Sequence, residues 1–531
     1  MLNKISAFMN RKLIYLFYVF IAFTLINLLL YHLKLILYPY PLDPNEGAIL
    51  LTTEKLIKAE NPFLLKNQPA ETNVYGVFYN FVSYPFAKVF GNTTQVHKTV
   101  AGISILLSCW LIFLWMSRLK IPLALKWASL AILYSSFLFY VTPLTRPDGL
   151  GLFLFLASIF IPYFFEFSYV SLFLSVFLGL SAFYTKNYFI LGIFYVISYV
   201  FLFVSKKRGI IIGSSALFIF LSSAFIMNGV YEWYFYNAFL ANYNITSYYD
   251  FWAGALLKQV VTFIRVNAGL TVIFAIIIYF IVLKDFKKNA LYFRKNLNAI
   301  SDLSRWEEPF FLKRISLNTY CLILSSLVLF LKMGGWGGMW MCYFFQLLSP
   351  FFVVFVIDKL KAVKINYAVI LLLIIWNMVS MYSFKGEFKS DDERLKNWEI
   401  ISKRISNKKD VLHAMAIAPI IINQNKKVYD TGNSWYFVWG GHIKSKLLKF
   451  IFKRGDDIIV QNNKYKEFVT QKVKLRKFDL IVLEKGVENW MVPQKIIRDN
   501  YTPKETMEMY FPHVNSVDTL VVWEPKKRGR L

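Results

Sequence analysis

The sequence predicts a polytopic α-helical membrane protein that ends in a soluble α/β domain. Hydrophobic residues make up 57% of its 531 residues, charged residues only 17%, and the mean hydropathy is +0.45. A soluble protein of this length does not need so much apolar surface. The apolar residues are grouped in runs of roughly 18–22, the length that a helix needs to cross the hydrocarbon core of a bilayer.

We expect eleven membrane-spanning helices. The first apolar run follows a basic N-terminal segment, but it is too long for the core of a signal peptide and has no small-residue cleavage site, so we interpret it as a retained helix. The expected spans are residues 13–37, 96–116, 124–141, 150–166, 169–184, 188–204, 209–227, 266–283, 315–332, 342–357 and 366–383. They define a predicted transmembrane domain over residues 1–384 with a long outer loop at 39–95.

Basic residues mark one side of the membrane. They recur in every second connecting loop except the very short one near Phe167, and this recurrence is typical of cytoplasmic loops. They are Arg118, Lys120, Lys206, Lys207, Arg208, the basic residues of segment 284–314, Lys359, Lys361 and Lys364. The N-terminus is therefore predicted to be cytoplasmic, as expected of a protein of the bacterial inner (plasma) membrane. This clustering between apolar runs also accounts for the net charge of +28 without nucleic-acid binding.

The composition changes after the last expected span. Residues 385–531 contain no apolar run of membrane length. Short apolar runs alternate there with helix-like segments, the runs being residues 410–415, 427–430, 478–483 and 519–523. This alternation predicts a small α/β domain. With a cytoplasmic N-terminus and eleven spans, the domain is expected outside the cytoplasm.

Ionisable residues collect on the predicted outer face, close to helix ends. They are Asp43 and Glu46 in the first outer loop, Arg146 and Asp148 in the second, Lys186 in the third and Lys332 in the fifth. Lys332 leads into the glycine-rich segment 334–338, where the backbone can approach a ligand closely. Ionisable groups at a membrane boundary are costly and are usually kept for binding or chemistry. We therefore prefer one shared polar site to the alternative of local ion pairs and lysines that extend to the lipid headgroups.

These residue types favour transfer of a phosphate-linked group. A carboxylate at the membrane surface can act as a general base on an acceptor hydroxyl or amine. Arginine binds phosphate through a planar fork, and lysine binds it as a point charge. Because nucleotide sugars are cytoplasmic, an outward-facing transferase needs a lipid-linked donor, such as a polyprenyl-phosphate sugar. The sequence has no P-loop, dinucleotide fingerprint or His/Cys metal spacing.

Several motifs also carry a family resemblance. They are Asp43-Pro44-Asn45-Glu46-Gly47, Asn61-Pro62-Phe63, Arg146-Pro147-Asp148-Gly149-Leu150, Tyr184-Thr185-Lys186-Asn187 and the segment 332–338 running into Tyr343-Phe344. Because these motifs occur in the same order over roughly residues 10–384, the chain resembles the GT-C membrane glycosyltransferases of the protein-mannosyltransferase and aminoarabinose-transferase type (glycosyltransferase family 39-like). The resemblance implies a GT-C-like fold, an acid of the first loop as catalytic base and an acid of the second loop in support.

The resemblance assigns roles to particular residues. Asn45-Glu46 stands where the family has an adjacent Asp-Glu pair, and Asp43 lies two positions before Asn45. We favour Glu46 as the catalytic base, with Asp43 as the alternative and Asp148 in support. The expected ligands of the donor phosphate are Arg146, Lys186 and Lys332. The three carboxylates could also hold a divalent cation through oxygen ligands, or act without one.

Two other classes of membrane protein are compatible with this pattern. A polysaccharide polymerase or ligase would also face outward, but we would expect one very large outer loop. A lipid-linked sugar transporter (flippase) would place charged or helix-breaking residues in mid-span. The expected partners of the transferase are the polyprenyl-phosphate sugar donor, an acceptor glycan, lipid or protein, and membrane lipids.

The predicted orientation can be tested with single cysteines. An impermeant thiol reagent added to intact cells is expected to label a cysteine at Asn67 or Asn462 and to leave one at Asn298 unlabelled, because only the first two positions are predicted to lie outside. Permeabilised cells provide the control, since Asn298 should then react. Labelling of position 298 alone in intact cells would reverse the orientation and remove the argument for a lipid-linked donor.

Overall fold

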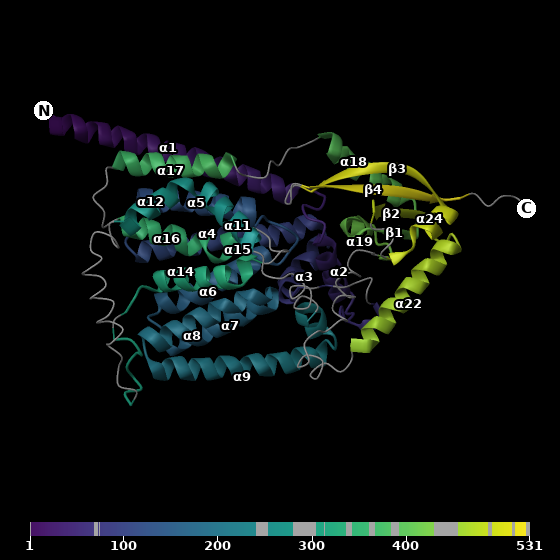
Figure 1. Ribbon diagram of the computed structural model, residues 1–531, viewed down its shortest axis with the longest axis horizontal. Coiled ribbons are helices and arrows are strands. Elements are labelled where there is room, and N and C mark those ends of the chain that lie inside the picture. The colour runs from purple at the N-terminus through teal and green to yellow at the C-terminus, as the bar shows by residue number, and fades with distance from the viewer. Residues whose placement is uncertain are drawn as a thin grey trace, which may run out of the picture.

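The computed structural model of the protein consists of a helical bundle with a small α/β domain at one end (Figure 1). The structure describes residues 2–67, 73, 75–240, 253–279, 304–312, 314–335, 342–360, 367–383, 392–429, 455–486, 491–511 and 516–526. Several positions used in the sequence-based predictions lie outside these residues, namely segment 336–338, Lys361, Lys364 and most of the basic segment 284–314, which includes Asn298.

The bundle is made of apolar helices that lie side by side along the long dimension of the molecule (Figure 1). They are α1 (Leu2–Leu37), α4 (Thr94–Arg118), α5 (Leu123–Tyr140), α6 (Asp148–Phe164), α7 (Tyr169–Thr185), α8 (Leu191–Phe203), α9 (Lys206–Val230), α11 (Ala253–Val266), α12 (Ala268–Ile278), α14 (Leu317–Leu331), α15 (Cys342–Leu347), α16 (Ser349–Leu360) and α17 (Tyr367–Ser383). Short turns η2 (Asn187–Ile190), η3 (Tyr236–Leu240) and η5 (Met333–Gly335) adjoin them.

Membrane-length helices are present, but eleven spans are not established. Within the described residues, five helices are long and apolar enough to cross a bilayer: Tyr15–Leu37, Thr94–Arg118, Leu123–Tyr140, Lys206–Val230 and Leu317–Gly335. A sixth span would combine α11 and α12, which meet at an angle of 96°. The other expected spans fall on shorter helices, and the one expected at 342–357 is divided between α15 and α16.

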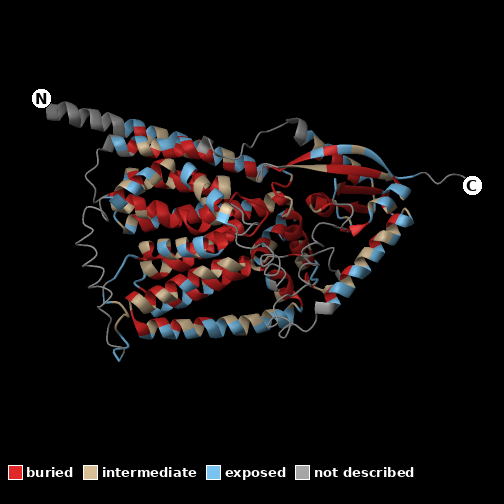
Figure 2. Ribbon diagram, viewed as in Figure 1, coloured by how far each residue is buried: buried red, intermediate tan, exposed pale blue. Residues whose placement is uncertain are grey.

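The helix that carries Asp148, α6, is shorter than a membrane span and is enclosed by other helices. It packs against α4, α7 and α8, and its residues Phe155 and Phe160 are completely buried. In contrast, α9 lies at the edge of the bundle and exposes large apolar side chains such as Phe225 (Figure 2). An exposed apolar stripe of this kind suits contact with lipid tails. The start of α6 is therefore a rigid position deep in the bundle.

Two shorter helices lie between the first and second long spans. They are α2 (Glu46–Ile57) and α3 (Phe78–Phe90), with the turn η1 (Leu65–Asn67) between them. Helix α2 is apolar on more than one side: Ile49 belongs to the core of the bundle, whereas Leu50 and Leu51 belong to the core of the α/β domain. The helix that begins at Glu46 is thus held between the two parts of the molecule.

The C-terminal part contains a small four-stranded sheet with flanking helices. Its strands are β1 (Val411–His413), β2 (Leu480–Glu484), β3 (Tyr501–Phe511) and β4 (Ser516–Pro525), in the order β1-β2-β4-β3. Strands β1 and β2 are parallel, and the other neighbours are antiparallel. The helices are α18 (Asp392–Ser406), α19 (Ala418–Asn423), α22 (Gly455–Lys474) and α24 (Gln494–Asn500), with the turn η6 (Met415–Ile417) before α19. Three of the four expected apolar runs form strands, and the run at 427–430 does not.

The α/β domain rests directly on α2. Helix α19 and turn η6 pack against α2, and a Cβ atom at Gly47 would lie 2.5 Å from the Cβ of Ala418. The ring of Tyr40, just before the first acidic loop, stacks on Trp398 of α18 at 5.6 Å between centroids. The domain therefore covers the loop and helix that carry Asp43 and Glu46. It also buries Asn462, so its exposed neighbour Asn463 is the better labelling position.

The close approach at Gly47 predicts a stability effect of one methyl group. Gly47→Ala should lower the midpoint of thermal unfolding in detergent, because overpacking costs about 1–3 kcal/mol and exceeds the gain in helix propensity. Gly229→Ala is the matched control, since a Cβ there meets nothing within 4 Å. Equal midpoints for the two variants would mean that α2 and α19 are not in contact.

Candidate functional site

The first acidic loop is a tight turn that leads into α2. Asn45 is the N-cap residue of α2. Its backbone N–H and its side-chain amide donate to Asp43 Oδ1 at 2.9 and 3.0 Å. An aspartate that accepts from the backbone two residues later is a common turn former. The turn fixes Asp43 immediately before the N-terminus of α2, where negative charge is favoured.

Glu46 connects two loops that are distant in sequence. Its Oε2 accepts a hydrogen bond from the backbone N–H of Leu42 at 3.1 Å, and its Oε1 accepts one from Thr145 at 2.8 Å. Leu42 precedes Asp43 and Thr145 precedes Arg146, so the Glu46 carboxylate holds the two loops together. Burial raises the pKa of Glu46 above its usual range, while nearby Lys98 and the Thr145 N–H act in the opposite direction.

The predicted outer-face residues form a buried chain of alternating charges. Arg146 Nη1 donates to Asp43 Oδ2 at 3.0 Å, and Arg146 Nε lies 3.6 Å from Asp148 Oδ2. Lys186 Nζ and Gln346 Nε2 both donate to Asp148 Oδ1, at 2.7 and 3.0 Å. The four charged residues are at most 7% exposed. Two acids and two bases thus balance in charge, which makes their burial tolerable.

Aromatic rings surround the two cations of this chain. The ring of Tyr75 lies 5.3 Å from the Arg146 guanidinium and 5.5 Å from Lys186 Nζ. The rings of Tyr188 and Tyr343 lie 5.4 and 5.3 Å from Lys186 Nζ. Tyrosine faces attract cations through their quadrupole. The lysine is therefore held in place by three rings as well as by Asp148.

Some residues of the site were not predicted from the sequence. Lys98 is completely buried, and its Nζ donates to the backbone carbonyls of Tyr38 and Tyr40 at 2.9 and 2.6 Å. It balances Glu46 electrostatically. A lysine in the first two turns of an apolar helix was the available signal, but such lysines usually extend to the membrane surface. Gln346 gave no signal, because a lone amide in an apolar helix has no distinctive spacing.

Lys332, the expected phosphate ligand from the fifth outer loop, is exposed where α14 ends. Residues 336–341 of that loop lie outside the described residues. Among the described residues, no group of three or more His, Cys, Asp or Glu side chains is arranged to hold a metal ion. A role for Lys332 in donor binding and a role for a divalent cation both stay predictions.

The α/β domain closes over the acidic loop. Asp518 of β4 is near enough to Asp43 to respond to its charge: burial, and then the negative charge of Asp43, raise the pKa of Asp518 above its usual range. Asp43 and Glu46 are both completely buried. A substrate can therefore reach these carboxylates only if the loop or the domain above it moves.

Two solved structures of ArnT from Cupriavidus metallidurans have the same fold. The structure in the apo state has a TM-score of 0.51 at 10% sequence identity, and the structure bound to undecaprenyl phosphate has 0.54 at 9%. Each likeness covers 95% of this chain and 98% of the other. Neither a protein-family model nor a curated protein sequence matches the chain. At such low identity the likeness establishes a GT-C-like membrane fold, whereas the reaction has to be argued from the site.

The buried charge chain predicts strong coupling between Lys186 and Asp148. Lys186→Met alone should cost about 3–5 kcal/mol of stability, because it leaves a buried carboxylate undercompensated. Adding Asp148→Asn should recover part of this loss, measured as non-additive shifts in thermal unfolding. The exposed pair Lys207–Glu307 is the control and should be nearly additive. Additivity at Lys186 and Asp148 would contradict the pairing.

Proposed function

We propose that the protein is a membrane glycosyltransferase that moves a sugar from a polyprenyl-phosphate donor to an acceptor glycan, lipid or protein. The observation that carries the proposal is the buried chain from Asp43 through Arg146 and Asp148 to Lys186 at one end of an apolar bundle. The binding of undecaprenyl phosphate by a protein of the same fold supports a donor of this class.

The two cations suit the phosphate of the donor. In the structure both cations contact carboxylates. A phosphate that enters between Arg146 and Lys186 would replace some of these carboxylate contacts. Arg146 offers a planar fork of donors, and Lys186 offers a mobile point charge within its cage of aromatic rings. Both would stabilise the charge that builds up on the leaving polyprenyl phosphate.

The reaction is a single displacement at the sugar. The acceptor oxygen or nitrogen attacks the anomeric carbon, and the bond between that carbon and the phosphate oxygen breaks, its electron pair going to the phosphate. The proton of the acceptor passes to a carboxylate acting as general base. The products are the inverted glycoside and polyprenyl phosphate.

The contacts favour Asp43 as the base over Glu46, which the sequence had favoured. Both oxygens of Glu46 accept backbone hydrogen bonds that hold the two loops together. Asp43 Oδ1 accepts from Asn45, but Asp43 Oδ2 contacts Arg146, the cation that we propose as a phosphate ligand, and a phosphate that binds Arg146 would free this oxygen. A base beside the phosphate-binding cation lies close to the reacting carbon. Glu46 then acts as a positioning residue.

Release of polyprenyl phosphate from a purified polyprenyl-phosphate sugar tests the proposal. A transferase should release it in the presence of an acceptor, whereas a flippase would move the donor intact. Asp43→Asn is expected to lower the turnover of the folded protein by about 10²–10⁴, and to lower the melting temperature, because its amide N–H₂ would face a donor of Arg146 or Asn45. Glu46→Gln should lower the melting temperature as well, because its amide N–H₂ would face a backbone N–H donor.

Exposed Glu232 provides the control, and Glu232→Gln should be unchanged in both measurements. A folded but inactive Glu46→Gln variant beside an active Asp43→Asn variant would assign the base to Glu46. Full activity of both variants would overturn the transferase proposal.

A further inference from the structure

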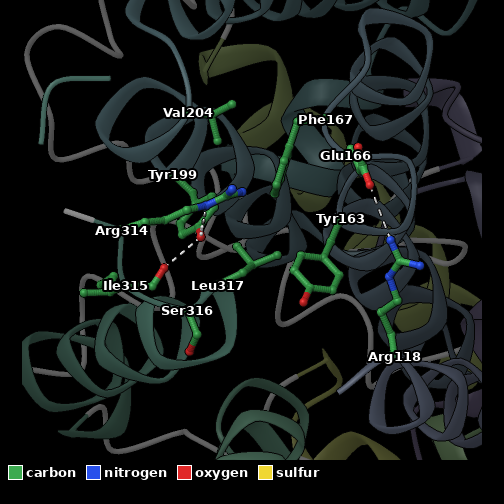
Figure 3. Close-up of a pocket in the computed structure, with 10 residues that line it drawn as sticks. All are labelled: Arg118, Tyr163, Glu166, Phe167, Tyr199, Val204, Arg314, Ile315, Ser316 and Leu317. Atoms are coloured by element: carbon green, nitrogen blue, oxygen red, sulfur yellow. Dashed lines mark hydrogen bonds and ion pairs between the residues drawn. The ribbon is translucent and has the colours of Figure 1, made fainter. Parts of the chain in front are cut away.

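A second polar cavity lies at the opposite end of the bundle from the charge chain. Its volume is about 570 Å³. Its lining includes Arg118, Tyr163, Glu166, Phe167, Tyr199 and Arg314 (Figure 3). Helix α4 connects the two ends of the bundle. Its first residue, Thr94, donates a side-chain hydrogen bond to the carbonyl of Pro39 beside the acidic loop, and its last residue, Arg118, lines the cavity. A helix of 25 residues separates them by roughly 37 Å.

Arg314 is the main cation of this cavity. Its Nε donates to the hydroxyl of Tyr199 at 3.1 Å, and its guanidinium lies 5.4 Å from the ring of Phe167 and 5.7 Å from that of Tyr199. None of the contacts that the structure describes for Arg314 is with a carboxylate. The rings and the hydroxyl therefore position the guanidinium without neutralising it.

A second arginine faces the cavity from the other side. Figure 3 shows Arg118 beside Glu166, across the cavity from Arg314. The Arg118–Glu166 pair is long, at 3.5 Å, and its side chains are 53% and 84% exposed. Exposed pairs of this kind contribute little free energy. An incoming anion can therefore replace Glu166 as the partner of Arg118 at small cost.

The backbone that carries Glu166 is held in an unusual conformation. Glu166 and Phe167 both have positive φ values, +52° and +56°, a region that residues with a side chain seldom occupy. Arg208 Nη1 donates to the carbonyl of Phe167 at 3.2 Å. Strained residues of this kind cluster at binding sites, where the surrounding structure maintains them. Here they form one wall of the cavity.

Exposed apolar side chains adjoin the charged groups of the cavity. Tyr163, Ile315 and Leu317 line it, and Phe165 beside it and Ile315 are 64% and 37% exposed. Basic pockets between the ends of membrane helices are characteristic of sites for anionic lipid headgroups. A free anion has no acyl chains, so it would gain nothing from contact with the exposed side chains of Phe165 and Ile315.

We propose that this cavity binds the phosphate-bearing headgroup of an anionic membrane lipid. Arg314 and Arg118 contact the phosphate, and the acyl chains lie along Phe165 and Ile315. Under the orientation predicted from the basic loops, the lipid belongs to the cytoplasmic leaflet, which carries the negative surface charge. The proposal does not depend on the proposed transferase activity, because the cavity and the charge chain lie at opposite ends of the bundle.

Native mass spectrometry of the delipidated full-length protein tests this site. Phosphatidylglycerol and phosphatidylcholine with the same acyl chains are titrated separately. Phosphatidylglycerol should bind at least about tenfold more tightly, because the choline cation of phosphatidylcholine offsets the attraction of its phosphate to the arginines. Arg314→Gln should remove this preference, since it deletes one of the two attracting charges. Arg305→Gln is the matched control: Arg305 is exposed, pairs with Glu308 and does not line the cavity.

Arg118→Gln gives an independent measurement, since Arg118 lies at the end of α4, is 53% exposed and loses only a long ion pair. It should reduce the preference for phosphatidylglycerol by about tenfold. Equal binding of the two lipids, or a preference unchanged in both arginine variants, would overturn the proposal. Displacement of phosphatidylglycerol by millimolar inorganic phosphate would show a site for free phosphate and would also overturn it.

Discussion

The arrangement of the candidate site depends on the carboxylate of Glu46. This completely buried group accepts one backbone hydrogen bond from Leu42 and another from Thr145. Burying a carboxylate is expensive unless its oxygens are occupied, so the two loops that supply these donors must meet. When these two loops meet, Asp43 of the first loop comes into contact with Arg146 of the second. The electrostatics of the site follow from this contact.

Charge balance explains how so many ionisable groups are buried together. Asp43 and Asp148 alternate with Arg146 and Lys186, and Lys98 lies near Glu46. A balanced buried cluster is stable but easily perturbed, because an added phosphate changes the partner of each cation. The α/β domain lies over this cluster through the contact between Gly47 and Ala418. Access to the cluster and movement of the domain are therefore physically connected.

The two ends of the bundle differ in how their cations are held. At the end near the α/β domain, Arg146 and Lys186 are enclosed and paired with acids. At the other end, Arg314 lies on aromatic rings and Arg118 has a weak, exposed partner. Enclosed cations suit a ligand that enters one defined site, whereas open cations beside apolar surface suit a lipid that stays in the bilayer. Basic residues are thus enclosed among acids at one end of the bundle and open beside apolar side chains at the other.

The sequence alone determined the class of the protein and the residues worth examining. Apolar runs and basic loops are local patterns, so they predicted membrane helices, a C-terminal sheet and the set Asp43, Glu46, Arg146, Asp148 and Lys186. The number of spans was not determined in this way, because several apolar runs form helices shorter than a membrane span, and one of them, α6, is enclosed by other helices. Run length measures hydrophobicity along the chain, and it does not distinguish contact with lipid from contact with protein.

Only the tertiary structure decided which of these residues touch. The hydrogen bond from Arg146 to Asp43 joins positions 103 residues apart, and that from Gln346 to Asp148 joins positions 198 apart. Such contacts depend on how helices pack, which no local spacing encodes. Packing also brought Lys98 next to Glu46, and the partners of the two acids are the ground on which we propose Asp43 rather than Glu46 as the base. The physical reason is that a carboxylate's role follows from the partners of its oxygens, and those partners come from distant segments.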